Sequence, residues 1–255
     1  MIACPVCETN AGSYILNVVN NYNIHKCHGC GLEYTSPNPT NKDLELFYSS
    51  YLDVRASEDI VRLNAEKNIA LLEKYGLNRK SSYVLDFGCG NGEFVEIYGS
   101  NCYGIELKPN PLCDRIKSSL EELPLEKFDC ITLWGVLEHL NDIQGIMSKL
   151  STVLKENGIL VITTVNAEGL IPFYHKPPEH LTYWTRKSFD ILGNNYGYDI
   201  IGYMNYEMYQ YSSIYLDRLL SRTPKEYKAA IMEANLPEII TIPTNEIFVV
   251  YQKKS

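Results

Sequence analysis

The chain of 255 residues has no long apolar run and comparatively little basic charge. No stretch approaches the roughly 20 consecutive apolar residues that a membrane helix needs. The first ten residues, MIACPVCETN, have neither the basic start nor the apolar stretch of a secretory signal. Lys and Arg number 23 against 31 Asp and Glu, so the chain as a whole does not attract phosphate backbones. We therefore expect a cytoplasmic protein without membrane insertion and without a nucleic-acid partner. Its oligomeric state is left open.

The eight cysteines fall into two groups. Four are scattered through apolar, strand-like segments, where cysteine behaves as a small buried hydrophobe in a reducing compartment. The others form two C-x-x-C pairs, the spacing of two knuckles that grip one tetrahedral Zn²⁺. Zinc also supplies folding energy that a short polar segment lacks. Redox activity and disulfides are the alternatives. The sequence thus predicts a structural zinc site with four ligands: Cys4, Cys7, Cys27 and Cys30.

Strand-like and helix-like segments alternate along most of the chain. Buried-strand patterns cover 83–87, 102–107, 128–135, 159–165, 198–203 and 246–252, and amphipathic or capped helices lie between them. Helical patterns also cover 41–75, ending at Gly76, and 207–235. Such alternation predicts an α/β fold with a doubly wound, mostly parallel, seven-stranded sheet. We expect a zinc-binding module in 1–40, a helical linker or lid in 41–78, and the main domain in 79–255 with a helical insertion at about 207–240.

A glycine-rich loop follows the first strand of this alternation. The segment VLDFGCGNGEF starts at residue 84, and Gly88 and Gly90 allow a tight turn and close approach of a ligand. Glu106 ends the next strand, where a carboxylate can accept hydrogen bonds from ribose hydroxyls. The third glycine comes one residue earlier than in the nicotinamide fingerprint, and Asp86 would crowd a pyrophosphate with negative charge. A cationic ligand, such as a sulfonium amino acid, accepts that carboxylate nearby.

At this point the sequence resembles the class I S-adenosylmethionine-dependent methyltransferases, over about residues 80–205. The resemblance implies a Rossmann-like fold and S-adenosylmethionine as cofactor. Ser119 stands where the family often has an Asp that reaches the adenine amino group, and Leu120 follows it. The resemblance assigns the remaining cofactor-binding positions as follows: Asp86, Gly88 and Gly90 around the methionine part, Glu106 on the ribose, Leu107 on the adenine, and Trp134 and Gly135 near the bound cofactor.

Two Glu-His pairs are candidates for acid–base chemistry on the acceptor. Glu138-His139 follows the fourth strand at the carboxyl edge of the sheet, where such folds place ligands. Quinone-type O-methyltransferases bind a divalent metal with a similar E-x-x-E-H segment, in which Gly135 here takes the first Glu position. Glu179-His180 lies in a Pro-rich loop that resembles the E-H-x-x-Y-[FW]-[ST] stretch of sugar C-methyltransferases. That resemblance implies a Glu-His pair for acid–base chemistry and carries over the following residues: Glu179, His180, Tyr183, Trp184 and Thr185.

The front end, CHGCGLEYTSPNPTNKDLELFYSSY, is similar to a methyltransferase subfamily with N-terminal zinc modules. Its members methylate nucleotide-linked deoxysugars or surface-glycan precursors. The C-methyltransferases have a long extra C-terminal domain, whereas this sequence ends after its last predicted strand. We therefore expect O-methylation of a small-molecule acceptor, a sugar or nucleotide-sugar, with His180 as the base and His139 as the alternative. The rivals are a sugar C-methyltransferase, a ribosomal RNA methyltransferase with a zinc finger, and a non-catalytic module that binds cofactor or glycan. In residues 1–40 the only Lys or Arg is Lys26, which counts against RNA.

Overall fold

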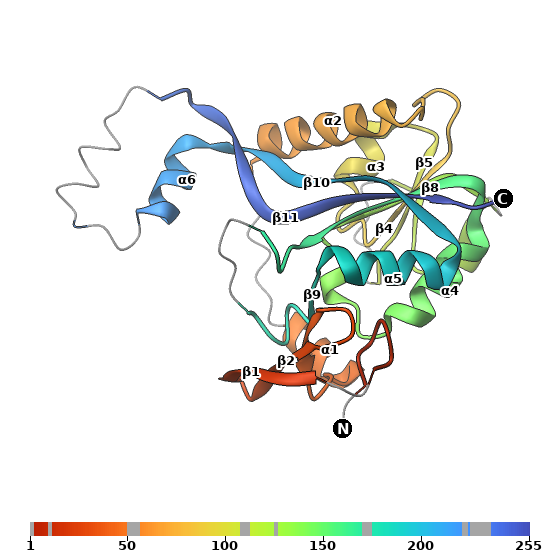
Figure 1. Cartoon of the computed structure of the whole chain (residues 1–255). Helices are drawn as coiled ribbons and strands as arrows, with labels where there is room; N and C mark the ends of the chain where they lie inside the picture. Colours follow the sequence, from red (N-terminus) through yellow and green to blue (C-terminus); the bar gives the residue numbers. More distant parts are fainter. Residues whose placement is uncertain are drawn as a thin grey trace.

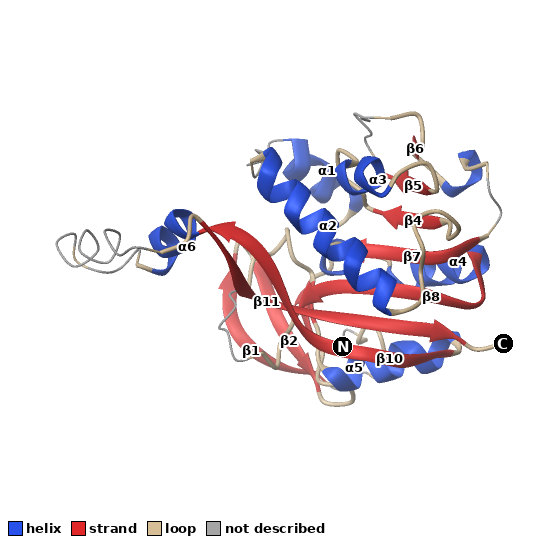
Figure 2. Cartoon of the chain, turned by 90° about the horizontal axis from the view of Figure 1, so that it is seen from above, coloured by secondary structure: helices blue, strands red, loops and turns tan. Residues whose placement is uncertain are grey.

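A seven-stranded sheet forms the centre of the protein. The computed structural model describes residues 3–9, 12–49, 57–107, 113–124, 127–169, 175–220, 224 and 236–255. Its strand order is β10-β11-β8-β7-β4-β5-β6 (Figure 2). Five neighbouring strands are parallel, and β11 runs antiparallel to both β8 and β10. This confirms the doubly wound α/β prediction. The strands are β4 (Val84–Phe87), β5 (Cys102–Ile105), β6 (Ile116–Lys117), β7 (Phe128–Trp134), β8 (Leu154–Val165), β10 (Tyr198–Tyr211) and β11 (Ile239–Lys253).

Helices cover both faces of this sheet. Helices α2 (Glu58–Lys74) and α3 (Glu93–Tyr98) pack on one face, and α4 (Ile143–Val153) and α5 (Arg186–Tyr196) on the other (Figures 1 and 2). Each face has its own apolar cluster, and burying one large apolar side chain contributes roughly 1.5–3 kcal/mol. Side chains cap two of these helices. Asp142 accepts a hydrogen bond from the Gly145 amide, and Thr185 forms a capping box with Ser188.

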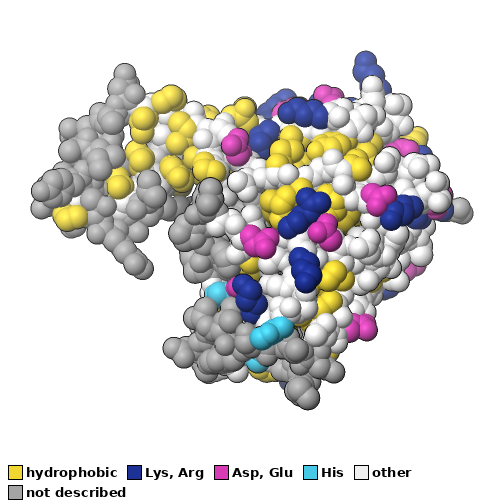
Figure 3. Space-filling view, viewed as in Figure 1, with side chains coloured by type: hydrophobic (Ala, Val, Ile, Leu, Met, Phe, Trp, Pro, Cys, Tyr) yellow, Lys and Arg dark blue, Asp and Glu magenta, His cyan; other side chains and the backbone are white. Residues whose placement is uncertain are grey.

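The segment predicted as one helical insertion is different. Residues 207–211 belong to β10 rather than to a helix, and only Ser212–Leu219 form helix α6. Strand β11 begins at Ile239, earlier than predicted, and pairs with β10 beyond the sheet. The Tyr and Ile side chains of this stretch favour strands, and here that preference is satisfied in a two-stranded ribbon. The ribbon and α6 form an arm that projects from the body (Figure 1), with hydrophobic side chains gathered on it (Figure 3). Residues 221–223 and 225–235 lie outside the described residues.

The predicted helical region 41–75 is two helices in the structure, α1 (Asn41–Ser49) and α2. Residues 50–56, between them, are not described. Helix α2 ends before Gly76, whose φ of +84° favours glycine. Among the described residues, no helix is long and apolar enough to cross a membrane.

A second, four-stranded sheet joins the N-terminal segment to a distant loop. Its order is β1-β2-β3-β9, with β1 (Gly12–Val19), β2 (Tyr22–Cys27), β3 (Glu33–Ser36) and β9 (Thr182–Tyr183). The sequence pattern indicated none of the first three strands. Because β9 lies in the loop after β8, hydrogen bonds link residues 1–40 to the main fold. The boundaries at residues 40 and 78 stay a prediction.

Candidate functional site

The glycine loop lies at the carboxyl edge of the sheet, between β4 and α3. Gly88 has φ +74°, and a Cβ there would approach the Val136 side chain to 2.6 Å. Any other residue would force that neighbour to move, so the sequence needs glycine here. A Cβ on Gly90, by contrast, would meet no atom within 4 Å. The backbone beside Gly90 is therefore open to a close approach.

Glu106 connects the end of β5 to this loop. One carboxylate oxygen accepts a hydrogen bond from the Gly90 amide at 3.0 Å, and the other from the Leu107 amide at 2.8 Å. Leu107 itself is 86% exposed. The structure thus brings together the loop, the acid and the apolar residue that the sequence assigned to one ligand. Glu106 is held by backbone donors alone in these contacts, so its orientation is fixed by the turn.

Asp86 lies at the base of the same loop and is 3% exposed. Burial raises the pKa of its carboxyl to about 7, nearby Glu106 adds to the rise, and a hydrogen bond from Thr132 Oγ1 at 2.8 Å opposes it. No ion pair with Asp86 is formed within the described ranges. A cationic ligand group would therefore stabilise the ionised carboxylate, which is what a sulfonium amino acid offers.

The other predicted cofactor-binding residues lie at the same edge. Ser119 and Leu120 follow β6, where Ser119 Oγ donates to Glu122 at 3.1 Å and Leu120 starts the short helix η1 (Leu120–Glu122). Trp134 ends β7 within an aromatic cluster, and the Gly135 amide donates to Thr163 Oγ1 at 2.8 Å. In the strand order, Trp134 and Gly135 at the end of β7 lie on one side of β4, and Ser119 and Leu120 after β6 lie on the other.

The two Glu-His pairs, which the sequence treats as rivals, form one cluster. Glu138-His139 lies on the short helix η2 (Leu137–His139), and Glu179-His180 lies in the loop before β9. The centroids of the two imidazole rings are 5.0 Å apart, edge to face. His180 Nε2 is 3.7 Å from a carboxylate oxygen of Glu179, and the Glu179 carbonyl accepts a hydrogen bond from the His139 ring. Sequence spacing alone could not show this convergence.

Burial sets the protonation of this cluster. It lowers the pKa of His180 to about 3, with the charges of His139 and Lys176 adding to the effect, and it lowers the pKa of His139 as well. Burial also raises the pKa of Glu138 to about 7, against a hydrogen bond from Thr164. Both imidazoles are therefore neutral near neutral pH. Glu138, His139 and His180 offer ligand atoms within 4.8 Å of one another, a set that could hold a divalent metal although Gly135 supplies no carboxylate.

The N-terminal sheet holds the His180 loop from below. Thr35 Oγ1 donates to the His180 carbonyl at 3.2 Å, and Glu33 contacts His175 at 3.0 Å. Tyr183 is fully buried, accepts a hydrogen bond from the Lys176 amide and donates to the His180 carbonyl. Tyr183, predicted as catalytic, is thus placed beneath the loop, where it positions His180.

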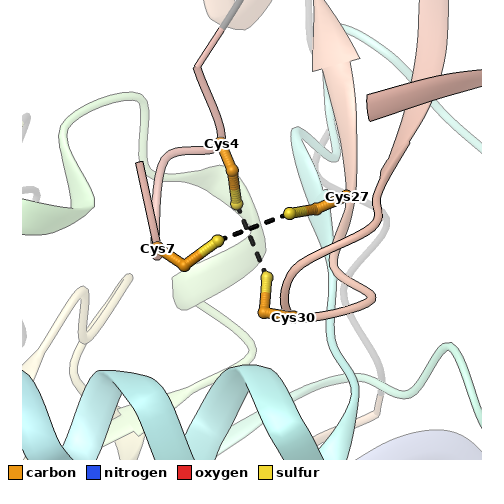
Figure 4. Close-up of side chains that lie close together, drawn as sticks. All are labelled: Cys4, Cys7, Cys27 and Cys30. Carbon is orange, nitrogen blue, oxygen red and sulfur yellow. Dashed lines mark hydrogen bonds between the residues drawn. The ribbon is translucent and has the colours of Figure 1, made fainter. Parts of the chain in front are cut away.

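The four predicted zinc ligands converge beneath α4 and α5. Figure 4 shows their sulfurs pointing to a common centre, with Cys4 Sγ 3.5 Å from Cys30 Sγ and Cys7 Sγ 3.4 Å from Cys27 Sγ. All four are free thiols within 4.8 Å of one another. Tetrahedral zinc with Zn–S bonds of about 2.3 Å requires S···S separations of about 3.8 Å. Small shifts fit the ion, so the donor set suits zinc.

Comparison with known proteins decides the family. The model of a methyltransferase domain family matches residues 58–202, more than half of the chain. This chain belongs to the family of S-adenosylmethionine-dependent methyltransferase domains. It is 30% identical over 129 residues to an uncharacterized protein of Methanocaldococcus jannaschii, covering 44% of this chain and 56% of that protein. It is 33% identical over 107 residues to a ubiquinone biosynthesis O-methyltransferase of Actinobacillus pleuropneumoniae, covering 32% of this chain and 45% of that enzyme.

This chain spans about half the length of each of these two relatives. Among solved structures, it is similar to the 1,6-didemethyltoxoflavin-N1-methyltransferase of Burkholderia thailandensis, with a TM-score of 0.55 and 14% identity. That alignment covers 96% of this chain and 99% of the other. At such low identity the likeness concerns the fold, which includes the strand order described above.

Sequence reasoning missed several residues of the methyltransferase site. Glu33 supports the loop, and Glu246, whose pKa burial raises to about 7, lies at the same sheet edge near Lys67. Their positions depend on strand pairing across the chain, which no local motif encodes. The one sequence signal for Glu246 is that it is a charged residue inside an otherwise apolar stretch.

Proposed function

We propose that this methyltransferase transfers the methyl group to an oxygen atom of a sugar or nucleotide-sugar, with His180 as the general base. The observation that carries this proposal is the convergence of His139 and His180 at the edge of the sheet where the glycine loop lies. The name of the O-methyltransferase relative supports oxygen as the acceptor atom. The subfamily resemblance of the front end supports a sugar, in surface-glycan or related biosynthesis.

The cofactor supplies an electrophilic methyl carbon on its sulfonium. Asp86 offers that cation a carboxylate, and the backbone of Gly88 and Gly90 leaves room for the amino-acid part. Glu106 would accept hydrogen bonds from the ribose hydroxyls, and Leu107, Ser119 and Leu120 would contact the adenine. Trp134 and Gly135 would lie next to the acceptor. Each of these side chains binds or orients, and none takes part in bond making.

The acceptor hydroxyl needs alignment and a place for its proton. The imidazole of His180 is neutral because burial lowers its pKa, so its lone pair is available over the physiological range. The His180 ring would take the O–H proton of the acceptor, while the cofactor would supply the methyl group and be left as a neutral thioether. Glu179, at 3.7 Å, stabilises the imidazolium that develops. Tyr183 and Thr35 keep the loop in place.

The rival functions differ in measurable products. Cofactor with a labelled methyl group, incubated with sugars, nucleotide-sugars and ribosomal RNA, should label only the sugar fraction, as an ether. Label in RNA, in a carbon–carbon bond, or in no fraction would contradict the proposal. The chain has a net charge of −8, which disfavours RNA. Repeating the assay with EDTA and with added Mg²⁺ or Mn²⁺ separates a base mechanism from a metal-assisted one.

We also propose that Cys4, Cys7, Cys27 and Cys30 bind one structural zinc. The convergence of the four thiols supports this, and free thiols fit the cytoplasmic location that we expect. The cluster belongs to the core under α5, and Thr185 Oγ1, at the start of that helix, donates to the Cys30 carbonyl at 2.8 Å. Zinc would therefore stabilise the N-terminal sheet and, through it, the His180 loop.

A further inference from the structure

Two buried hydrogen-bond donors lie in one aromatic cluster without an acceptor. Within the part of the chain that the structure describes, Lys67 Nζ and Trp134 Nε1 have no hydrogen-bond partner. Both contact Tyr206: the ammonium lies 4.0 Å from its ring centroid, and the indole stacks on it at 6.4 Å. An unpaired buried donor is destabilising, and more so when it is charged. An acceptor from outside the described residues would satisfy both donors.

The hydroxyl group beside the two donors already has a hydrogen-bond partner. The Tyr206 hydroxyl donates to Asn68 Oδ1 at 2.8 Å. Phe248 stacks on both Tyr206 and Trp134, so aromatic rings surround the two donors. A cation and an N–H between apolar rings match a group that carries negative charge on oxygen.

The charge of Lys67 is only partly balanced by the protein. Burial lowers its pKa to about 8, and the carboxyls of Glu207 and Glu246 oppose that effect. Neither carboxyl forms an ion pair with Lys67 in the described structure. Burial also raises the pKa of Glu246 to about 7, so near neutral pH this carboxyl carries less than a full charge. Lys67 thus keeps a positive charge that an anion can use.

The position of this cluster points to the acceptor rather than the cofactor. Tyr206 and Phe248 belong to β10 and β11, on one side of β7 in the strand order. The glycine loop and Glu106 follow β4 and β5, on the other side. We propose that Lys67 and Trp134 form a subsite for an oxyanion of the methyl acceptor, a carboxylate or a phosphate. The inference rests on the proposed function and narrows its substrate to anionic sugars and nucleotide-sugars.

The two tryptophans of the chain make a direct test available. The indole of Trp184 already donates to Thr182 Oγ1 at 3.0 Å and is fully buried, so its NMR signal is an internal reference. Protein labelled with ¹⁵N at the indole nitrogens is titrated with acetate and with inorganic phosphate, in the presence of S-adenosylhomocysteine. We expect a saturable downfield shift of the Trp134 signal alone. Lys67→Met should weaken this binding by roughly 10-fold or more, the effect of losing a charged hydrogen bond.

Arg62→Met is the matched control, because Arg62 is exposed on the same helix and is not among the charges that shift the pKa of Lys67. It should leave the titration unchanged. Thermal melts without anion check the fold: Lys67→Met should be at least as stable as the wild type, because it removes an unpaired buried charge. Added phosphate should then stabilise the wild type and not the variant.

Three results would overturn the inference. The first is no shift of Trp134 with either anion, and the second is the same response in Lys67→Met as in the wild type. The third is a Trp134 shift that S-adenosylhomocysteine alone causes and that 5′-methylthioadenosine, which lacks the carboxylate, does not cause. Such a shift would assign the two donors to the carboxylate of the cofactor. Calorimetry of S-adenosylhomocysteine binding is independent of all three. Failure of that binding would defeat the proposed function instead.

Discussion

The two halves of this active site are encoded in different ways. The cofactor half comes from one stretch of sequence, in which the Asp86–Gly90 loop and Glu106 follow successive strands and meet through one hydrogen bond. The acceptor half combines η2, the loop before β9, and the N-terminal sheet that supports that loop. In the proposed function, a local motif therefore positions the cofactor site, whereas long-range strand pairing positions the acceptor site. The first kind of site is shared across a family, and the second is where members can differ.

The largest expected effect tests the acceptor half directly. His180→Ala should slow turnover by roughly 10²–10⁴-fold, the usual range for loss of a general base, and leave S-adenosylhomocysteine binding unchanged. Glu179→Gln should cost less, because that residue orients the imidazole. Steady-state kinetics and calorimetry measure the two quantities separately. If His139→Ala abolishes turnover while His180→Ala does not, the base lies on η2.

Removal of the zinc site should reach the acceptor half without touching the cofactor half. Cys27→Ser should lose the metal, measured by elemental analysis at about one zinc per wild-type chain. Turnover should fall by roughly 100-fold, because a displacement of about 1 Å in a catalytic group has that effect. Binding of S-adenosylhomocysteine should remain close to wild type. Cys113→Ser is the control outside the cluster. A wild-type protein without zinc, or with a disulfide among these four cysteines, would contradict the claim.

A third change separates the halves from the other side. Glu106→Ala should weaken S-adenosylmethionine binding by roughly 1.5–3 kcal/mol through loss of charged hydrogen bonds. The exposed Glu73 provides the matched control, Glu73→Ala. The zinc content and the order of the N-terminal sheet should not change. Equal affinities for wild type and Glu106→Ala in calorimetry would remove Glu106 from the ribose.

The smallest expected effect is a pH-dependent gain in stability. The folded pKa of Asp86 is raised to about 7 from 3.8, the value in the unfolded chain. The contribution of this carboxyl to the free energy of unfolding is therefore complete below the unfolded pKa and is lost as pH rises through the folded pKa. Asp86→Asn removes this titration. It should be more stable than the wild type by about 1–3 kcal/mol at pH 8 and show a smaller gain at pH 5.5. Denaturant unfolding without cofactor measures the difference, and cofactor binding should weaken in parallel. A stability difference that does not vary with pH would contradict the assigned pKa.

Much of the fold and of the cofactor half could be predicted from the sequence. The pattern from residue 83 to 203 has strands of the right period, and Asp142 and Thr185, residue types that often cap helices, do so here. The ribbon of β10 and β11 could not be predicted. Its Tyr-rich stretch satisfies helical spacing and strand propensity equally well, and only the pairing of Tyr211 with Ile239 decides between helix and strand. The convergence of His139 and His180 could not be predicted for a related reason. Their contact depends on how a loop folds over η2.

The pairing of β3 with β9 has a consequence for how the chain folds. Glu33 pairs with Tyr183, so the N-terminal sheet completes only after some 150 further residues have been synthesised. Closing so long a loop adds only a few kcal/mol of entropy cost, since each doubling of length adds about 0.6 kcal/mol. The cost in time is greater, because non-local pairing slows folding. Until β9 arrives, β3 has an unpaired edge that can join another chain.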